Sequence, residues 1–223
     1  MKTFKVLEIK ESVFEDNNRQ ADLLRDELKK RKTFLLNLMS SPGSGKTTTV
    51  LRTIEALKSD MTIGVMEADI DSDVDAHAVS ETGTKVIQLH TGGMCHLDAD
   101  MTKQGLLGLG TENIDFVILE NVGNLVCPAE FDTGASKNAM ILSVPEGDDK
   151  PLKYPLMFSM VDVLLINKID VIDYFDFDLE AVKARAQKLN PNIKIIPISA
   201  RTGEGIDEWA DWIRTEVKNW KGQ

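Results

Sequence analysis

The sequence predicts a three-layer α/β fold, in which helices cover both faces of a mostly parallel β-sheet. Strand-like apolar segments alternate with helix-like segments along most of the 223 residues. A glycine-rich segment directly follows the first of these apolar runs, and two further short motifs follow later runs at 167–170 and 199–201. Ligands bind beyond the carboxyl ends of the strands in open sheets of this kind, so we expect the three motifs to meet at one edge.

The alternation can be followed along the chain. A polar segment at 12–32 carries Phe14, Leu23, Leu24 and Leu28 at roughly helical spacing, which predicts a surface helix ahead of the core. We therefore divide the chain into an N-terminal extension with this helix (1–32) and a main domain (33–223). Strands are expected at 34–39, 62–67, 85–89, 115–120, 138–144, 161–166 and 193–198. One helix is expected from the glycine-rich loop to about 59, and a short helix is expected to end at about 82. Further helices are expected at 97–107, 178–189 and 205–219. The segment 145–156 is expected to be an irregular insertion because it contains prolines and charged residues.

Composition narrows the class of protein. The formal net charge of −10 disfavours nucleic acid or an anionic membrane surface as the main partner. No apolar stretch approaches the length of a membrane span, and residues 1–10 lack the apolar core of a signal peptide, so we expect a cytoplasmic protein. The two cysteines, Cys95 and Cys127, are not expected to form a structural disulfide in that compartment.

A phosphate-binding loop is the first motif. The apolar run 34–39 leads into Ser40-Ser-Pro-Gly-Ser-Gly-Lys46-Thr47, where glycines let backbone N–H groups close on phosphate oxygens. Lys46 is placed to reach the β/γ-phosphates, and the Thr47 hydroxyl to hold Mg²⁺. Ser40 stands where the usual pattern has glycine, and the alternative is a glycine-rich turn that binds nothing. The expected phosphate-binding residues are Gly43, Ser44, Gly45, Lys46, Thr47 and Thr48.

The second and third motifs indicate which base is bound. Asp170 of Asn167-Lys168-Ile169-Asp170 offers a carboxylate that accepts both the N1–H and the amino group of guanine, a donor pair that adenine lacks. Ser199-Ala200-Arg201 follows the next strand-like run. The expected base-binding residues are Asn167, Lys168, Asp170, Ser199, Ala200 and Arg201. The order of the three motifs resembles that of the guanine-nucleotide-binding GTPases.

Soft metal ligands lie in the middle of the chain. Cys95 and His96 are adjacent, and Cys127 follows 32 residues after Cys95. Two thiolates and an imidazole suit Zn²⁺ or Ni²⁺, although three ligands are one short of a closed tetrahedral site. A water or another subunit would have to complete it. The alternative is that the cysteines are small buried apolar residues.

These motifs together resemble one family. Thr91-Gly-Gly-Met-Cys-His-Leu-Asp-Ala99, Glu120-Asn-Val-Gly-Asn-Leu-Val-Cys-Pro128 and Pro145-Glu-Gly-Asp-Asp149, interleaved with the GTPase motifs, look like the HypB family of hydrogenase nickel-incorporation GTPases. The resemblance covers about residues 15–220, and Ser40 is itself found in that family.

The resemblance implies a SIMIBI-type P-loop NTPase fold with the GTPase domain at 33–223. It implies a GTP-hydrolysing metallochaperone that delivers nickel during [NiFe]-hydrogenase maturation. GTP/GDP, Mg²⁺ and Ni²⁺ or Zn²⁺ would be its cofactors. In the family, the equivalents of Cys95, His96 and Cys127 bind metal where two subunits of a nucleotide-loaded homodimer meet. A nickel-carrying accessory protein and the hydrogenase large-subunit assembly machinery are the implied partners, with no nucleic acid and no membrane.

The resemblance also supports Asp69, Asp75 and Glu120 as a nucleotide and Mg²⁺ cluster with Thr47, since Mg²⁺ prefers oxygen ligands. Lys46, Asp75 and Glu120 are the candidate catalytic residues, and solvated acids are the alternative for the carboxylates. No clear water-orienting glutamine is found near Glu120, so slow intrinsic hydrolysis is expected.

Two other functions stay open at this point. One is a related chaperone GTPase of the urease accessory type, although such proteins carry Cys-Pro-His, which this chain does not. The other is a non-catalytic metal-storage module, but the three histidines and two cysteines form no ligand-rich tract. The Cys-x-x-Cys-Gly-Cys motif and the histidine-rich stretch of some family members are also not found in this sequence, so the thiol site at 95–127 is the expected metal site.

Overall fold

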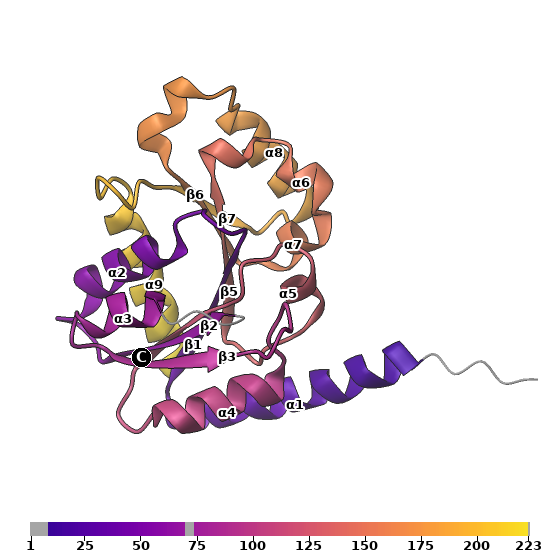
Figure 1. Ribbon diagram of the computed structural model, residues 1–223, viewed down its shortest axis with the longest axis vertical. Helices are drawn as coiled ribbons and strands as arrows, with labels where there is room; N and C mark the ends of the chain where they lie inside the picture. Colours follow the sequence, from indigo (N-terminus) through magenta and orange to yellow (C-terminus); the bar gives the residue numbers. More distant parts are fainter. Residues whose placement is uncertain (1–8, 70–73, 223) are drawn as a thin grey trace, which may run out of the picture.

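The computed structural model describes residues 9–69 and 74–222, without the side chains of residues 9–13, 74 and 75. Seven strands form one sheet in the order β3-β2-β4-β1-β5-β6-β7 (Figure 1). The strands are β1 (Phe34–Ser40), β2 (Ile63–Asp69), β3 (Lys85–His90), β4 (Phe116–Glu120), β5 (Lys137–Ser143), β6 (Val163–Asn167) and β7 (Lys194–Pro197). Every pair of neighbouring strands is parallel, so their carboxyl ends share one edge and the predicted fold class is confirmed.

Helices occupy the connections between these strands. The α-helices are α1 (Ile9–Arg31), α2 (Lys46–Leu57), α3 (Val74–Ser80), α4 (Ala99–Leu109), α5 (Cys127–Glu130), α6 (Lys150–Lys153), α7 (Pro155–Met160), α8 (Leu179–Leu189) and α9 (Ile206–Lys221). Two 3₁₀ helices are η1 (Val144–Glu146) and η2 (Ile169–Tyr174). No helix in the described ranges combines the length and apolar composition needed to cross a membrane.

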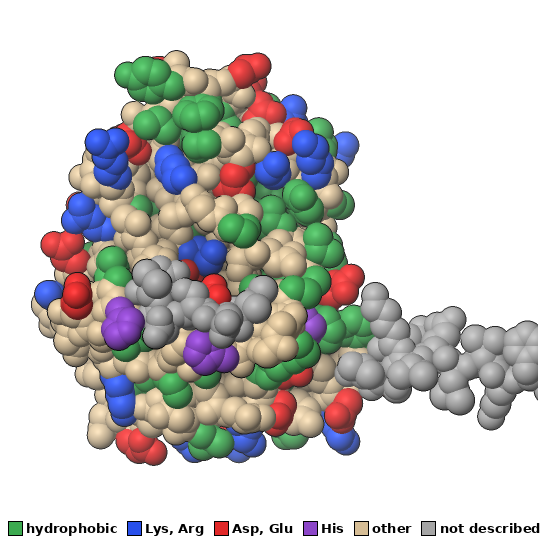
Figure 2. Space-filling view, in the orientation of Figure 1, with side chains coloured by type: hydrophobic (Ala, Val, Ile, Leu, Met, Phe, Trp, Pro, Cys, Tyr) green, Lys and Arg blue, Asp and Glu red, His purple; other side chains and the backbone are tan. Residues whose placement is uncertain are grey.

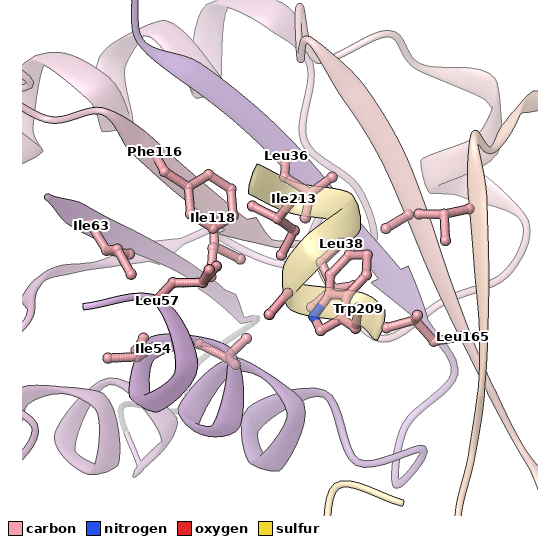
Figure 3. Close-up of a cluster of buried hydrophobic side chains, with 14 of the residues drawn as sticks. Leu36, Leu38, Ile54, Leu57, Ile63, Phe116, Ile118, Leu165, Trp209 and Ile213 are labelled. Atoms are coloured by element: carbon pink, nitrogen blue, oxygen red, sulfur yellow. The ribbon is translucent and has the colours of Figure 1, made fainter. Parts of the chain in front are cut away.

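One face of the sheet packs against α2 and α9. Side chains alternate between the two faces of a strand, so alternate residues of β1 and β4 point the same way. Figure 3 shows these side chains meeting the apolar faces of the two helices. The contributing residues include Leu36, Leu38, Phe116, Ile118, Ile54, Leu57, Trp209 and Ile213. Trp209 is buried, and its indole Nε1–H donates to the hydroxyl of Thr53 at 2.9 Å, which satisfies the one polar group that the indole brings into the core.

The opposite face is covered by two separate groups of helices. Leu35, Val117 and Leu119 lie against α4 and α1, and Met140, Leu142, Leu164 and Ile166 lie against α7 and α8. Helices therefore cover both faces, which gives the three layers that the sequence predicts (Figure 1).

The N-terminal helix α1 lies along α4, as Figure 1 shows. Leu24 and Leu28 are buried there, whereas Leu23 is 65 % exposed. The Arg25 guanidinium donates to both carboxylate oxygens of Asp132 at 2.8 Å. The helix is thus a surface helix, as predicted, with one side anchored to the main domain. The division at residues 32 and 33 stays a prediction.

The expected irregular insertion at 145–156 is wrong. This segment forms the last part of η1, all of α6 and the start of α7. Pro151 and Pro155 stand in the first turns of α6 and α7, where the missing N–H of proline costs no helical hydrogen bond. Glu146 closes η1 by accepting from both the N–H and the hydroxyl of Ser143 at 2.7 Å. The prolines that suggested loops therefore begin short helices.

Candidate functional site

A cavity of about 470 Å³ opens at the carboxyl edge of the sheet, beyond β1, β2 and β4. It is lined by Pro42, Gly43, Gly45, Lys46, Thr47, Thr48, Glu67, Ala68, Asp69, Gln88, Glu120, Val122 and Gly123. The predicted phosphate loop thus forms one wall, and two of the predicted Mg²⁺ ligands, Asp69 and Glu120, stand across from it in the same cavity. This is the position at which open parallel sheets bind ligands.

The phosphate loop turns on two glycines with positive φ, Gly43 at 74° and Gly45 at 96°. At Gly45 the chain also passes so close to Asn167 that an added Cβ would lie 2.5 Å from the amide nitrogen Nδ2. Helix α2 begins at the next residue, Lys46, so its N-terminus faces the cavity. Free backbone N–H groups and the positive end of the helix dipole make this end a suitable site for phosphate.

Ser40, which stands where the phosphate-loop pattern usually has glycine, makes specific hydrogen bonds within the loop. Its hydroxyl accepts from Ser44 at 2.6 Å and from the Lys46 ammonium at 3.0 Å, and it donates to the carbonyl of Ser41 at 2.8 Å. Ser40 is buried at the end of β1. The serine therefore ties the loop to the strand and holds Lys46 close to it.

The second motif docks onto the phosphate loop. Asn167 Nδ2 donates to the Ser44 carbonyl at 2.9 Å, and Lys168 Nζ donates to the Gly43 carbonyl at 2.7 Å. Asn167 Oδ1 also accepts from the Ala200 N–H at 3.1 Å, which joins the third motif. The structure therefore brings all three sequence motifs together.

Asp170 lies at the edge of this assembly. Its carboxylate accepts from the Ser199 hydroxyl at 2.7 Å and stands 3.9 Å from the exposed Arg201 guanidinium. The Asp170 side chain is 15 % exposed, so a path to a base is open. Sequence reasoning missed Arg52 of α2, which donates to the carbonyls of Ala200 and Arg201 at 3.0 and 3.1 Å. It fixes the position of the third motif.

Oxygen ligands cluster beside the phosphate loop. The Thr47 hydroxyl lies 3.4 Å from Glu120 Oε1, and Asp69 ends the neighbouring strand β2. A hydroxyl and two carboxylates suit Mg²⁺. The role of these residues as Mg²⁺ ligands stays a prediction. The side chain of Asp75 lies outside the described part of the chain, and only its backbone is placed, in α3.

Two further residues of this cavity were missed from the sequence. Glu67 is only 3 % exposed, and the strand register pairs it with Glu120 on one side and Gln88 on the other. Glu67 and Asp69 are two positions apart on β2, so their side chains lie on the same face of the sheet. This spacing could have identified Glu67 from the sequence. Gln88 of β3 also lines the cavity.

The two cysteines meet. The sulfur atoms of Cys95 and Cys127 are in direct contact, although the two residues are 32 positions apart, and both are free thiols. The His96 ring lies near, with Nδ1 4.0 Å from Cys95 Sγ, and it stacks on Phe131. Within the described residues no group of three or more His, Cys, Asp or Glu side chains is already assembled to hold a metal. The structure thus brings the predicted thiols together and leaves the imidazole beside them.

Local contacts shift the pKa values of the Cys127 thiol and the His96 imidazole. The neighbouring Cys95 thiol, and then burial, raise the pKa of the Cys127 thiol. Burial lowers the pKa of His96, and the charges of Asp98 and Glu130 oppose this. At neutral pH the imidazole is therefore neutral, which is its metal-binding form, while Cys127 holds its proton.

The thiol loops begin at the nucleotide cavity. The N–H of Thr91, four residues before Cys95, donates to the Asp69 carbonyl at 3.2 Å. Gly123, four residues before Cys127, lies against the phosphate loop, because a Cβ there would be 3.2 Å from Pro42 N and 3.4 Å from Lys46 Nζ. Each thiol therefore lies only four residues from a contact with the cavity wall.

This fold and cavity define a P-loop nucleotide-binding protein. The CobW/HypB/UreG nucleotide-binding domain family matches residues 34–197. The hydrogenase maturation factor HypB of Escherichia coli K12 is 45 % identical over 212 residues, which span 95 % of this chain and 73 % of the relative. The chain therefore belongs to the HypB family of hydrogenase maturation factors, as the sequence motifs predict.

Solved structures agree with this assignment. HypB from Helicobacter pylori in complex with nickel is 38 % identical, with a TM-score of 0.85, over 92 % of this chain and 96 % of that chain. The signal recognition particle receptor FtsY from Elizabethkingia anophelis matches with a TM-score of 0.55 over 96 % of this chain and 78 % of its own. At 13 % identity FtsY shows the fold alone, and this fold is the SIMIBI-type fold expected from the sequence.

The two loop glycines give a matched prediction. We expect Gly43→Ala to lower the free energy of unfolding by about 1 kcal/mol, because alanine is strained at positive φ but meets no atom within 4 Å. Gly45→Ala should cost at least about 1 kcal/mol more, since its Cβ displaces Asn167 from the Ser44 carbonyl. Urea unfolding of both variants measures the difference. Equal losses would show that the approach of Asn167 does not require glycine.

Proposed function

We propose that this protein is a GTP-hydrolysing metallochaperone that delivers nickel during [NiFe]-hydrogenase maturation. The observation that carries the proposal is the short connection between the two sites. The loops that hold Cys95 and Cys127 both begin at the cavity walled by the phosphate loop. Nucleotide state and metal binding are therefore coupled over a few residues of backbone.

The proposed nucleotide is GTP. Asp170 is oriented by Ser199 and carries the acceptor pair that guanine requires, and the loop of Ala200 and Arg201 is braced from α2 by Arg52. Lys46 would neutralise charge on the transferred phosphoryl group, and Glu120 and Asp75 would act beside it. Mg²⁺ held by Thr47, Asp69, Asp75 and Glu120 would supply further charge neutralisation.

The proposed metal ligands are Cys95, His96 and Cys127, which suit Ni²⁺ or Zn²⁺. The H. pylori relative was crystallised with nickel, which supports nickel as the cargo. A fourth ligand must come from water or a partner subunit, since three do not close a tetrahedral site.

A GTP-dependent homodimer would supply such ligands. Apolar residues next to the thiols reach solvent, since Met94 is 38 % exposed and Val126 is 52 % exposed. Leu152 and Leu156 of α6 and α7 are 65 % and 51 % exposed. Figure 2 shows hydrophobic side chains along this side of the molecule, over the region of α5, α6 and α7. Such a surface suits a second copy that brings its own ligands.

Two alternatives remain distinct from this proposal. A urease accessory GTPase is disfavoured by the 45 % identity to a HypB protein over nearly the whole chain. A metal-storage module would bind metal without turnover, so a GTPase assay separates it from the proposal. A nickel-carrying accessory protein and the hydrogenase assembly machinery are the proposed partners. Free thiols able to bind metal suit the reducing cytoplasm.

The test of hydrolysis is Lys46→Ala in a steady-state GTPase assay with Mg²⁺. We expect the rate to fall about 10²–10³-fold, because one electrostatic contact to the developing charge is lost. Lys58→Ala, at the other end of α2, is the matched control and should keep the wild-type rate. Near-normal turnover of Lys46→Ala, or none in the wild type, would contradict the proposed enzyme.

The choice of base is tested at Asp170. Asp170→Ala should weaken GDP binding by about 10²-fold or more, because the guanine N1–H and amino group lose a charged acceptor. Asp170→Asn should prefer xanthine nucleotides, whose C2 carbonyl accepts from the new amide. Asp173→Asn in the same 3₁₀ helix is the control. If the wild type binds ATP as tightly as GTP in calorimetry, guanine is not the base.

The metal and the dimer are tested together by sedimentation with and without a GTP analogue and Zn²⁺ or Ni²⁺. We expect the analogue to induce dimers and the metal to strengthen them, and by linkage dimerisation must tighten metal binding by the same free energy. Cys95→Ala should weaken metal binding by about 10²-fold while sparing GDP affinity. A chain that is monomeric in all conditions would refute the dimer, and unchanged metal affinity in Cys95→Ala would refute the site.

A further inference from the structure

Three rings from separate parts of the chain lie together beside the thiols. The His96 imidazole stacks on Phe131, with ring centres 3.8 Å apart and an angle of 12° between the planes. Phe131 also contacts Phe14 of α1, with ring centres 4.9 Å apart and tilted by 41°. The N-terminal helix therefore reaches the His96 ring through one intervening aromatic side chain.

A single amide reinforces this arrangement. Asn17 of α1 accepts from the N–H of Ala99, three residues after His96, and donates to the carbonyl of Asp132, the residue after Phe131, both at 3.0 Å. The Asp132 carboxylate is held in turn by Arg25 of the same helix. Helix α1 thus fixes the His96 segment and the Phe131 segment relative to each other.

The stacked ring is close to the position that a metal would need. In a tetrahedral site with a metal–sulfur distance of about 2.3 Å and a metal–nitrogen distance of about 2.0 Å, sulfur and nitrogen lie about 3.5 Å apart. His96 Nδ1 is 4.0 Å from Cys95 Sγ, so only a small movement separates it from that geometry. A ring held in advance loses less rotational freedom when the metal binds.

We propose that Phe131, backed by Phe14 and Asn17 of α1, is a positioning residue that holds the His96 imidazole for metal binding. Helix α1 is then part of the metal site. This inference rests on the proposed metal-binding function. A positioning role differs from simple packing in one respect. Loss of the Phe131 ring must lower metal affinity only when the His96 imidazole is present.

The test is a double-mutant cycle on the full chain. Zn²⁺ affinity is measured by competition with a chromophoric chelator, and Co²⁺ absorption reports the ligand set. We expect Phe131→Leu to lower Zn²⁺ affinity about tenfold and to shift the Co²⁺ d–d bands in the direction seen for His96→Ala. Adding Phe131→Leu to His96→Ala should cause no further loss, since positioning has no effect without the ring it positions.

Controls separate this inference from stability and from the proposed function. Phe177→Leu, the same change at a half-buried phenylalanine just before α8, should leave Zn²⁺ affinity unchanged. Asn17→Ala keeps all three rings and should weaken Zn²⁺ binding by a few-fold while GDP affinity is retained. This variant tests the same arrangement if Phe131→Leu folds poorly.

Additive losses in the cycle, or wild-type Zn²⁺ affinity in both Phe131→Leu and Asn17→Ala, would overturn the positioning role. A wild-type chain that binds neither Zn²⁺ nor Co²⁺, with or without a GTP analogue, would instead refute the proposed metal function on which this inference rests.

Discussion

The Asn167 amide touches both other nucleotide motifs at once. Its nitrogen reaches the Ser44 carbonyl, its oxygen accepts from the Ala200 N–H, and Gly45 leaves the space through which it passes. Ser44 follows β1 and Asn167 ends β6, and these two strands are not neighbours, because β5 lies between them. Once this contact is made, the loops beyond the strand ends have little freedom relative to one another. The cavity, the direction of α2 and the place of Asp170 all depend on it.

Parallel pairing then assembles the chemistry beside that contact. The register of β2, β3 and β4 sets Glu67, Gln88 and Glu120 side by side, and the ends of β3 and β4 lead into the two thiol loops. A charged cluster and a pair of thiols would not come together from segments so far apart in a less regular sheet. The same regularity explains why the nucleotide cavity and the thiol pair share their connecting loops.

Much of the fold and of the nucleotide site could be predicted, because short stretches of sequence determine the strands and the three motifs. Apolar runs predict each of the seven strands within a few residues, and the three motifs mark the strand ends that meet. The error at 145–156 was also local, since Pro151 and Pro155 are compatible with both a loop and a first helical turn. Residues such as Arg52 and Phe131 could not be predicted, because their roles come from contacts made after folding. Arg52, for example, is an ordinary helical arginine until the chain brings the Ala200 carbonyl to it.

The thiol pair adds a last constraint on how the proposed switch would work. Two sulfur ligands of one tetrahedral metal lie about 3.8 Å apart, and the sulfur atoms of Cys95 and Cys127 already touch, so they are close enough to share one metal. A metal bound by both thiols would therefore hold the two loops together at their far ends from the cavity. The near ends are held by Thr91 against Asp69 and by Gly123 against Pro42. In the proposed switch, a phosphate group that enters or leaves between those near ends would change the spacing of the two loops, and the metal at the far ends would respond to the same change.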